Sequence, residues 1–213
     1  MERARAATEA ELELSASLIE SYLRQSLSNR SVRRFPLRDC LQEVSSGVGV
    51  SWDGYPVMGA TRDGIAPAKE AIGKDPERYK LVEPGTIFYN PMRILIGSIA
   101  MIDEDEGPGI TSPDYVVFKT VDGVLHPRWF YYWLRSSYGQ AFIKSLARGA
   151  VRERMLFRRL VSAEINMPSW NSQVDIAEKL KSVAELRRSV GGQLDTINKL
   201  PSALLRRAFS GEL

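Results

Sequence analysis

The C-terminal part of the chain, from Asn171 to Phe209, reads NSQVDIAEKLKSVAELRRSVGGQLDTINKLPSALLRRAF, and the organisation of the whole protein follows from it. Its apolar positions recur at steps of three and four residues with a mean of 3.5, the period of a helix that lays one seam along another helix. The seam consists of Leu200 and the eight residues expected at a coiled-coil interface: Ile176, Leu180, Val183, Leu186, Val190, Leu194, Ile197 and Leu204. A helix of this length is about 58 Å long, so we predict a coiled-coil strut.

Two features qualify this strut. Gly191 and Gly192 in its middle weaken the helix by about 1 kcal/mol each relative to alanine, and they mark either a soft point or the close approach of a partner backbone. Pro201 removes a helical N–H donor, so we expect a kink or a restart between Lys199 and Pro201. Gly211 is expected to end the helix.

The composition is that of a soluble globular chain of 213 residues, 44% hydrophobic and 26% charged, with a net charge of +3. The sequence contains no run of 18 apolar residues and no secretory signal, so we predict a cytoplasmic protein without a membrane span. Cys40 is the only cysteine, which excludes an internal disulfide framework and fits a reducing compartment. His126 is the only histidine, which excludes zinc sites built from several His and Cys ligands. We therefore predict no metal and no cofactor.

Residues 4–28 are predicted to form a second amphipathic helix. The end of this helix, residues 20–29, aligns without gaps to residues 202–211 at the end of the strut, with identical Leu, Arg and Ser at three positions. The match is either chance or the trace of a repeat, in which the chain holds the tail of one strut, a domain and then a complete strut. The apolar stripe of the N-terminal helix is Leu12, Ala16, Ile19, Leu23 and Leu27.

Between the two helices, residues 31–169 are punctuated by glycine and proline and contain short β-type runs. Residues 127–146 form a predicted helix that is apolar on nearly every side, as expected for a central core helix. We predict an α+β domain with a mixed, curved β-sheet, flanked by an N-terminal helix (1–30) and a long C-terminal coiled-coil helix (170–213). The predicted strands are 55–58, 85–89, 94–102, 115–120 and 163–167.

The densest positive charge of the chain lies between residues 144 and 159, where six cations are opposed only by Glu153. This segment is either a solvated charged surface or a ridge that binds phosphates, where cations replace the counterions of a nucleic acid. Arginine suits bidentate phosphate or guanine contacts better than lysine does. The six cations are Lys144, Arg148, Arg152, Arg154, Arg158 and Arg159.

A second candidate is the glycine-rich segment 48–74, which is long, polar and mixed in composition. It has the character of a loop that reads a DNA groove, and it has equally the character of a plain surface loop. The residues that we select for base or groove contacts are Trp52, Tyr55, Arg62, Lys69 and, further along the chain, Arg93.

Enzyme motifs are weak in this sequence. No glycine-rich nucleotide-binding motif is present. The residues Asn90-Pro91-Met92-Arg93 differ at the last two positions from the Asn-Pro-Pro-aromatic signature of amino-methyltransferases. Residues 75–80 lack the spacing of a nuclease carboxylate cluster. Cys40 and His126, the one conceivable Cys/His pair, are each interpreted as structural, so we predict no catalysis.

Several segments together resemble the specificity subunits of type I restriction–modification systems. They are Tyr89-Asn90-Pro91-Met92-Arg93, residues 96–100, residues 111–118, Gly149-Ala150-Val151-Arg152, Ile165-Asn166-Met167-Pro168 and the C-terminal residues 200–213. Their order and spacing over residues 32–213 carry the resemblance. In the family a Pro-Leu-Pro-Pro-type turn opens the spacer helix, whereas residues 168–172 read PSWNS here.

The resemblance implies a target recognition domain (31–169) on a conserved helical spacer (170–213), with residues 1–30 as the tail of a preceding spacer. Family members usually carry two such domains on paired antiparallel spacers, and each domain reads one half of a split DNA sequence. The chain departs from this pattern in having one domain, as a half-subunit. The resemblance further implies a bacterial or archaeal protein without catalysis of its own, which directs modification (methyltransferase) subunits, and through them restriction subunits, to double-stranded DNA.

Two other functions stay open from the sequence. One is a coiled-coil interaction or scaffold protein that does not bind DNA. The other is the specificity portion of a fused restriction–methylation enzyme. A half-subunit is expected to form a homodimer through its exposed seam, or to pair with a second recognition half, and a symmetric dimer would read an inverted repeat.

Overall fold

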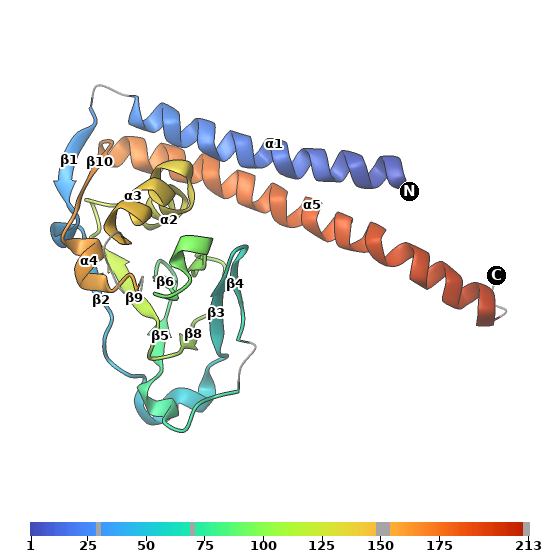
Figure 1. The fold of residues 1–213 in the computed structure, drawn as a ribbon, viewed down its shortest axis with the longest axis horizontal. Coiled ribbons are helices and arrows are strands. Elements are labelled where there is room, and N and C mark those ends of the chain that lie inside the picture. The colour runs from blue at the N-terminus through green and yellow to red at the C-terminus, as the bar shows by residue number, and fades with distance from the viewer. Residues whose placement is uncertain (29–30, 69–70, 148–153, 211–213) are drawn as a thin grey trace.

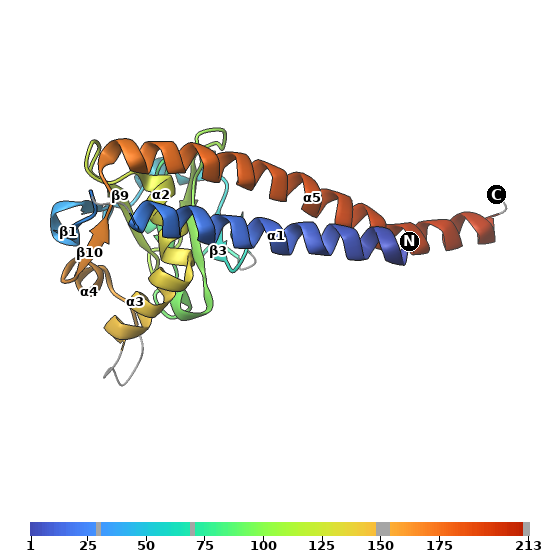
Figure 2. The same ribbon diagram turned by 90° about the horizontal axis from the view of Figure 1, so that it is seen from above.

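Two long antiparallel helices form a rod that carries a domain of short strands and helices (Figure 1). The computed structural model describes residues 1–28, 31–68, 71–147 and 154–210. Helix α1 runs from Glu2 to Leu27, and helix α5 runs from Trp170 to Ser210. The start of α1 and the end of α5 lie toward the same end of the rod, away from the domain, and α5 continues past α1 (Figures 1 and 2). The predicted N-terminal helix and C-terminal strut are therefore confirmed.

The pairing of α1 with α5 is held by polar as well as apolar contacts. The Arg187 guanidinium donates from Nη1 to the Leu12 carbonyl oxygen at 2.8 Å and to Ser15 Oγ at 2.7 Å. Closer to the domain, Lys179 Nζ lies 5.9 Å from the centre of the Tyr22 ring, a cation–π contact. These contacts place early α1 against late α5, as the antiparallel arrangement requires.

The apolar seam of α5 meets α1 of the same chain along its first part. Four of its residues, Ile176, Leu180, Val183 and Val190, are buried. Leu194 and Ile197 are half-buried, and the side chain of Leu204 lies outside the described residues. Leu186 is 52% exposed and Leu200 is 40% exposed, so neither is packed within this chain.

Helix α5 is continuous across Pro201, so the expected restart does not occur. A proline removes one helical donor, and in this exposed part of the helix water can bond the freed carbonyl. Gly191 and Gly192 also stay helical, with open space around the position of an added Cβ, so no partner backbone approaches them in this chain. Gly211, the expected stop, lies outside the described residues.

The domain is α+β, as predicted, and its named strands pair antiparallel. One parallel contact is present, an isolated bridge between Val57 and Ile110. The four-stranded sheet has the order β2 (Leu41–Glu43), β9 (Val116–Thr120), β6 (Ile87–Tyr89) and β7 (Ile99–Met101). The two-stranded pairs are β1 (Arg33–Pro36) with β10 (Glu164–Met167), β3 (Met58–Thr61) with β4 (Gly64–Pro67), and β5 (Lys80–Val82) with β8 (Gly109–Thr111).

Several sequence predictions within the domain are wrong in detail. The strand predicted at 55–58 is β3, which runs from Met58 to Thr61. The predicted strand 94–102 begins as a 3-10 turn, η4 (Ile94–Ile96), because Gly97 adopts a left-handed conformation with φ +87° and ends the turn before β7. The predicted helix 127–146 is two helices, α2 (Pro127–Arg135) and α3 (Ser137–Ala147), which meet at Ser136. A further short helix, α4 (Phe157–Val161), was not predicted.

Helix α2 is the central core helix that the sequence predicts. Trp129, Phe130 and Trp133 are buried between the four-stranded sheet and the two long helices. Trp129 Nε1 donates to Ser26 Oγ of α1 at 3.2 Å, and Leu23 of α1 belongs to the same buried cluster. The core therefore joins the domain to the rod, and this shared packing fixes the orientation of the domain relative to the rod.

A charged junction also ties the domain to α5. Arg128 of α2, 2% exposed, forms ion pairs with Asp103 and with Glu104 in the loop between β7 and β8. From α5, Lys181 reaches Glu104 at 3.3 Å, and Arg188 reaches Asp105 at 3.3 Å. The two outer pairs are exposed and contribute little on their own, but together they hold this acidic loop against the rod.

Candidate nucleic-acid interface

The cations of the predicted ridge lie on three neighbouring pieces of backbone. Lys144 is exposed on α3, Arg154 is exposed just before α4, and Arg158 and Arg159 lie within α4, the first exposed and the second half-buried. Among the residues that the structure describes, none of these four side chains forms an ion pair. Arg148 and Arg152 lie outside the described residues.

The fold brings Arg93 to this ridge. The Met155 amide donates to the Pro91 carbonyl oxygen at 2.9 Å, so the backbone next to Arg154 runs beside the turn that carries Arg93. Arg93 is exposed at the start of η4, and the turn is tightened by the Met92 amide, which donates to Asn90 Oδ1 at 3.0 Å. We name the described cations Lys144, Arg154, Arg158, Arg159 and Arg93 the ridge.

Arg62 lies elsewhere, in the turn between β3 and β4. Its carbonyl oxygen accepts a hydrogen bond from Arg135 Nη2 at 2.5 Å. This turn borders a groove of about 760 Å³ between the rod and the domain, whose other walls include Ile19 of α1 and Arg187 of α5. Tyr132 lines the same groove, and burial raises its pKa to about 12, so the phenol is neutral. The prediction grouped Arg62 with Trp52 and Tyr55, but it lies at the groove.

The 3-10 segment η2 (Gly49–Gly54) lies at the tip of the domain that is farthest from the rod (Figure 1). Trp52 belongs to this segment, and Tyr55 follows it directly. Both side chains are half-buried, whereas Val50 on the same segment is 88% exposed. Lys69, the remaining residue selected for groove contacts, lies outside the described residues.

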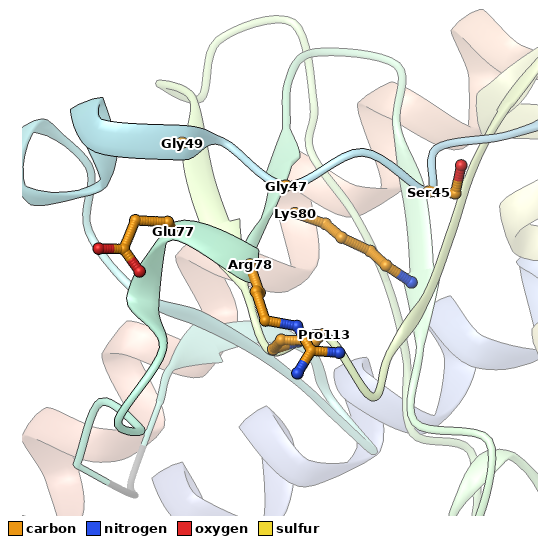
Figure 3. A pocket seen from close by; sticks show the side chains of 7 residues that line it. All are labelled: Ser45, Gly47, Gly49, Glu77, Arg78, Lys80 and Pro113. Carbon is orange, nitrogen blue, oxygen red and sulfur yellow. The ribbon is translucent and has the colours of Figure 1, made fainter.

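The tip also holds a pocket that the sequence analysis did not identify (Figure 3). It has a volume of about 380 Å³. Arg78 ends the 3-10 turn η3 (Pro76–Arg78), and Lys80 begins β5, with one extended residue, Tyr79, between them. In Figure 3 the Arg78 and Lys80 side chains extend to one side of this backbone, and the Glu77 side chain points away from both. The pocket is lined by Ser45, Gly47, Gly49, Glu77, Arg78, Lys80 and Pro113.

The side chain of Tyr79, between the two cations, points to the opposite side and anchors this backbone. Its side chain is buried, and its hydroxyl accepts a hydrogen bond from the Gly73 amide at 2.9 Å. Its carbonyl oxygen accepts from the Val48 amide at 2.7 Å. Gly47 bridges to Lys80, and a Cβ at Gly47 would lie 2.3 Å from the Glu77 carbonyl oxygen. Only glycine lets the two segments come this close.

The electrostatics of the pocket are dominated by its two cations. Burial lowers the pKa of Lys80, and the more distant charges of Glu43 and Asp114 oppose this shift only in part. Lys80 Nζ donates one hydrogen bond, to the Tyr115 carbonyl oxygen at 2.7 Å. Within the described part of the chain, the Arg78 guanidinium makes no hydrogen bond and no ion pair.

The sequence contains a signal for this pocket. Residues 75–80 lack the spacing of a nuclease carboxylate cluster, but within them Tyr79 separates the two cations Arg78 and Lys80. An aromatic residue between two cations is the pattern of a strand that is anchored on one side and charged on the other.

Within the described residues, no cluster of three or more His, Cys, Asp or Glu could hold a metal ion. Cys40 is buried, and burial raises its pKa, which disfavours the nucleophilic thiolate. Burial, with a smaller contribution from Arg128, lowers the pKa of His126, whose ring lies 5.7 Å from that of Trp170. The surroundings of Cys40 and His126 are those of residues with a structural role.

Comparisons of the sequence and of the structure with known proteins both find type I specificity subunits. A search against family models found no match. The type I restriction enzyme EcoBI specificity subunit of Escherichia coli is 24% identical over 128 residues, which cover 55% of this chain and 26% of that protein. The crystal structure of the type I restriction–modification S subunit from M. genitalium matches with a TM-score of 0.68 at 14% identity, over 97% of this chain and 57% of that one. The chain has the fold of a type I specificity subunit.

Two further solved structures share this specificity-subunit fold. The HsdS subunit from Thermoanaerobacter tengcongensis matches with a TM-score of 0.56 at 15% identity, over all of this chain and 55% of that one. A chain from a structural study of complex assembly and conformational transition in the type I system matches with a TM-score of 0.54 at 18% identity, over all of this chain and 57% of that one. The chain thus spans about half the length of these solved subunits, and the predicted resemblance is confirmed.

Membrane association through a spanning helix finds no support in the described residues, because none of their helices is long and apolar enough to cross a bilayer.

Proposed function

We propose that the chain is a non-catalytic, sequence-specific DNA recognition subunit of a type I restriction–modification system, acting in the cytoplasm. The observation that carries the proposal is a cation-bearing domain held in a fixed direction on a two-helix rod, in the fold of the specificity subunits. In this proposal residues 31–169 are the recognition domain, residues 170–213 are the spacer, and residues 1–30 correspond to the tail of a preceding spacer.

The ridge would supply the sequence-independent part of DNA binding. Its cations are unpaired within the described residues and are therefore free to replace counterions along a backbone. If the six cations between residues 144 and 159 each held one phosphate, log K would fall against log salt with a slope of about −5, roughly a 1,000-fold loss between 50 and 200 mM. Trp52 and Tyr55 at the tip, together with Arg93, remain our candidates for contacts that depend on the bases.

The rod would set the distance between two recognition domains. Because α1 covers the first part of the α5 seam, pairing with a second copy or a second recognition half would use the part of α5 that continues past α1. There Leu205 is 59% exposed and Phe209 is 89% exposed. Apolar helix surface of this kind is typical of an interface. DNA repeats about every 34 Å, so a spacer of about 58 Å would place two half-sites more than one turn apart.

The same rod would dock the modification subunits, and through them the restriction subunits. The groove between rod and domain presents both apolar and charged walls. A partner bound in this groove would contact the spacer and the recognition domain together. Its binding would therefore depend on the orientation of the domain relative to the rod.

Selection of bound duplexes from a randomised pool tests the DNA-recognition proposal. We expect one enriched half-site for the isolated chain, an inverted or split pair of half-sites in the presence of a modification subunit, and a steep salt dependence of the affinity. A chain that retards no duplex at 50 mM salt would contradict the proposal and would favour a coiled-coil scaffold instead. A salt slope near zero on the selected duplex would remove the ridge from the interface.

A further inference from the structure

The pocket at the tip of the domain lies apart from the ridge, and within the described residues neither of its two cations forms an ion pair. Arg78 and Lys80 point to the same side, while Tyr79 fixes their backbone from the other side through its buried ring and its bonds to Gly73 and Val48 (Figure 3). The geometry is thus built into the backbone and does not depend on how two flexible side chains happen to lie.

The free donors of the pocket suit an anion, because Glu77, the one carboxylate among the described residues that line it, points away from both cations and forms no ion pair with either (Figure 3). The Lys80 ammonium is part-buried, its one hydrogen bond goes to a neutral carbonyl, and an ammonium has three donors, so two are left. Arg78 keeps all five donors of its guanidinium free within the described residues. Partial burial without a bonded carboxylate costs free energy, and an anion bound between the two groups would offset that cost.

A phosphodiester fits these donors better than a carboxylate or a nucleotide base does. Its two non-bridging oxygens can each accept several hydrogen bonds, so one phosphate can be held by a guanidinium and an ammonium at once. A guanine edge would be satisfied by the arginine alone and would leave two donors of the part-buried Lys80 ammonium unused.

We propose that Arg78 and Lys80 clamp one backbone phosphate of the target duplex at the tip of the domain. This inference rests on the proposed DNA-recognition function and adds a contact outside the ridge. The clamp spans the end of η3 and the start of β5, and η3 packs against η2, which carries Trp52. A phosphate held there would tether the tip of the domain to the duplex without reading a base itself.

The test uses the full chain and the duplex recovered by selection, with binding measured by fluorescence anisotropy from 50 to 200 mM KCl. The variants are Arg78→Gln and Lys80→Met, and the matched control is Arg3→Gln, which removes the same charge at the start of α1. For Arg78→Gln we expect the salt slope to become less negative by about 0.9, so that its defect is about 3.5-fold larger at 50 than at 200 mM. Lys80→Met should act in the same direction, and Arg3→Gln should match the unmutated chain.

A scan of the duplex with neutral methylphosphonate linkages locates the contact. We expect one linkage whose neutralisation weakens the unmutated chain but causes no additional loss in Arg78→Gln. The base preference of the variant, measured by repeating the selection, should be unchanged.

Three results would overturn the clamp while the proposed function stands: Arg78→Gln behaves as Arg3→Gln does, no linkage couples to Arg78, or the variant changes its preference at one base pair. The last result would make Arg78 a base-reading residue. If the unmutated chain binds no duplex at all, the proposed function fails, and the clamp fails with it.

Discussion

The coverage of the α5 seam by α1 predicts a large stability difference between two leucines on the same helix. Leu180 is fully buried and belongs to the core cluster, whereas Leu186, less than two turns further on, is 52% exposed. Truncation of a buried leucine to alanine costs about 2–5 kcal/mol because it removes transfer free energy and leaves a cavity. We therefore expect Leu180→Ala to lower the free energy of unfolding by about 3 kcal/mol, and Leu186→Ala to lower it by less than about 1 kcal/mol.

Urea unfolding followed by the fluorescence of the buried Trp129 and Trp133 measures both variants. With a slope of about 3 kcal/mol per molar urea, Leu180→Ala should shift the midpoint by about 1 M, and Leu186→Ala should shift it by about 0.3 M or less. Because α1 belongs to the same chain, both shifts should be independent of protein concentration. Equal shifts, or a difference between the two shifts that changes with protein concentration, would mean that another chain covers the seam at Leu186, and the reasoning would be refuted.

Three further predictions concern other parts of the molecule. Gly139→Ala should destabilise the fold by about 2 kcal/mol, because its Cβ would lie 2.1 Å from the Trp133 carbonyl oxygen. Gly192→Ala, where the added Cβ meets open space, should stabilise the fold by up to about 1 kcal/mol. Thermal unfolding of the two variants measures both effects. The pKa of His126 is lowered in the folded state, so the unfolded chain takes up this proton first. Stability should therefore fall as the pH drops below about 6.5, and His126→Gln should abolish that step in urea titrations at pH 5–7. Phe209→Glu should weaken self-association in sedimentation, with Leu14→Glu, an exposed leucine of α1, as its control.

The internal similarity between residues 20–29 and 202–211 gains a structural reading. The first segment ends α1, where Leu23 is buried and Ser26 bonds Trp129 of the domain. The aligned positions on α5 are Leu205 and Ala208, on the part of the helix that continues past α1. If the similarity is a repeat, this part of α5 is suited to pack on a second recognition domain in the way α1 packs on this one, which is the pairing that the Phe209→Glu variant probes.

The local features of this protein could be read from its sequence. A mean apolar spacing of 3.5 identified the strut, the crowded aromatic residues of 127–134 identified the core helix, and one cysteine with one histidine argued against disulfide and zinc sites. These features are local because a helix brings together residues three and four apart, whatever the rest of the chain does.

What the tertiary structure decided is which surfaces meet. The apolar seam of α5 predicted that another helix packs against it but did not show which one. The path of the chain places α1 there. Arg93 joined the ridge, Arg62 moved to the groove, and Arg78 with Lys80 met Gly47 and Pro113 to form a pocket. Such contacts join residues that are tens of positions apart in the sequence, through turns whose geometry depends on packing. The periodicity of the sequence therefore does not predict them. Sequence motifs indicate them only where they resemble those of a protein family.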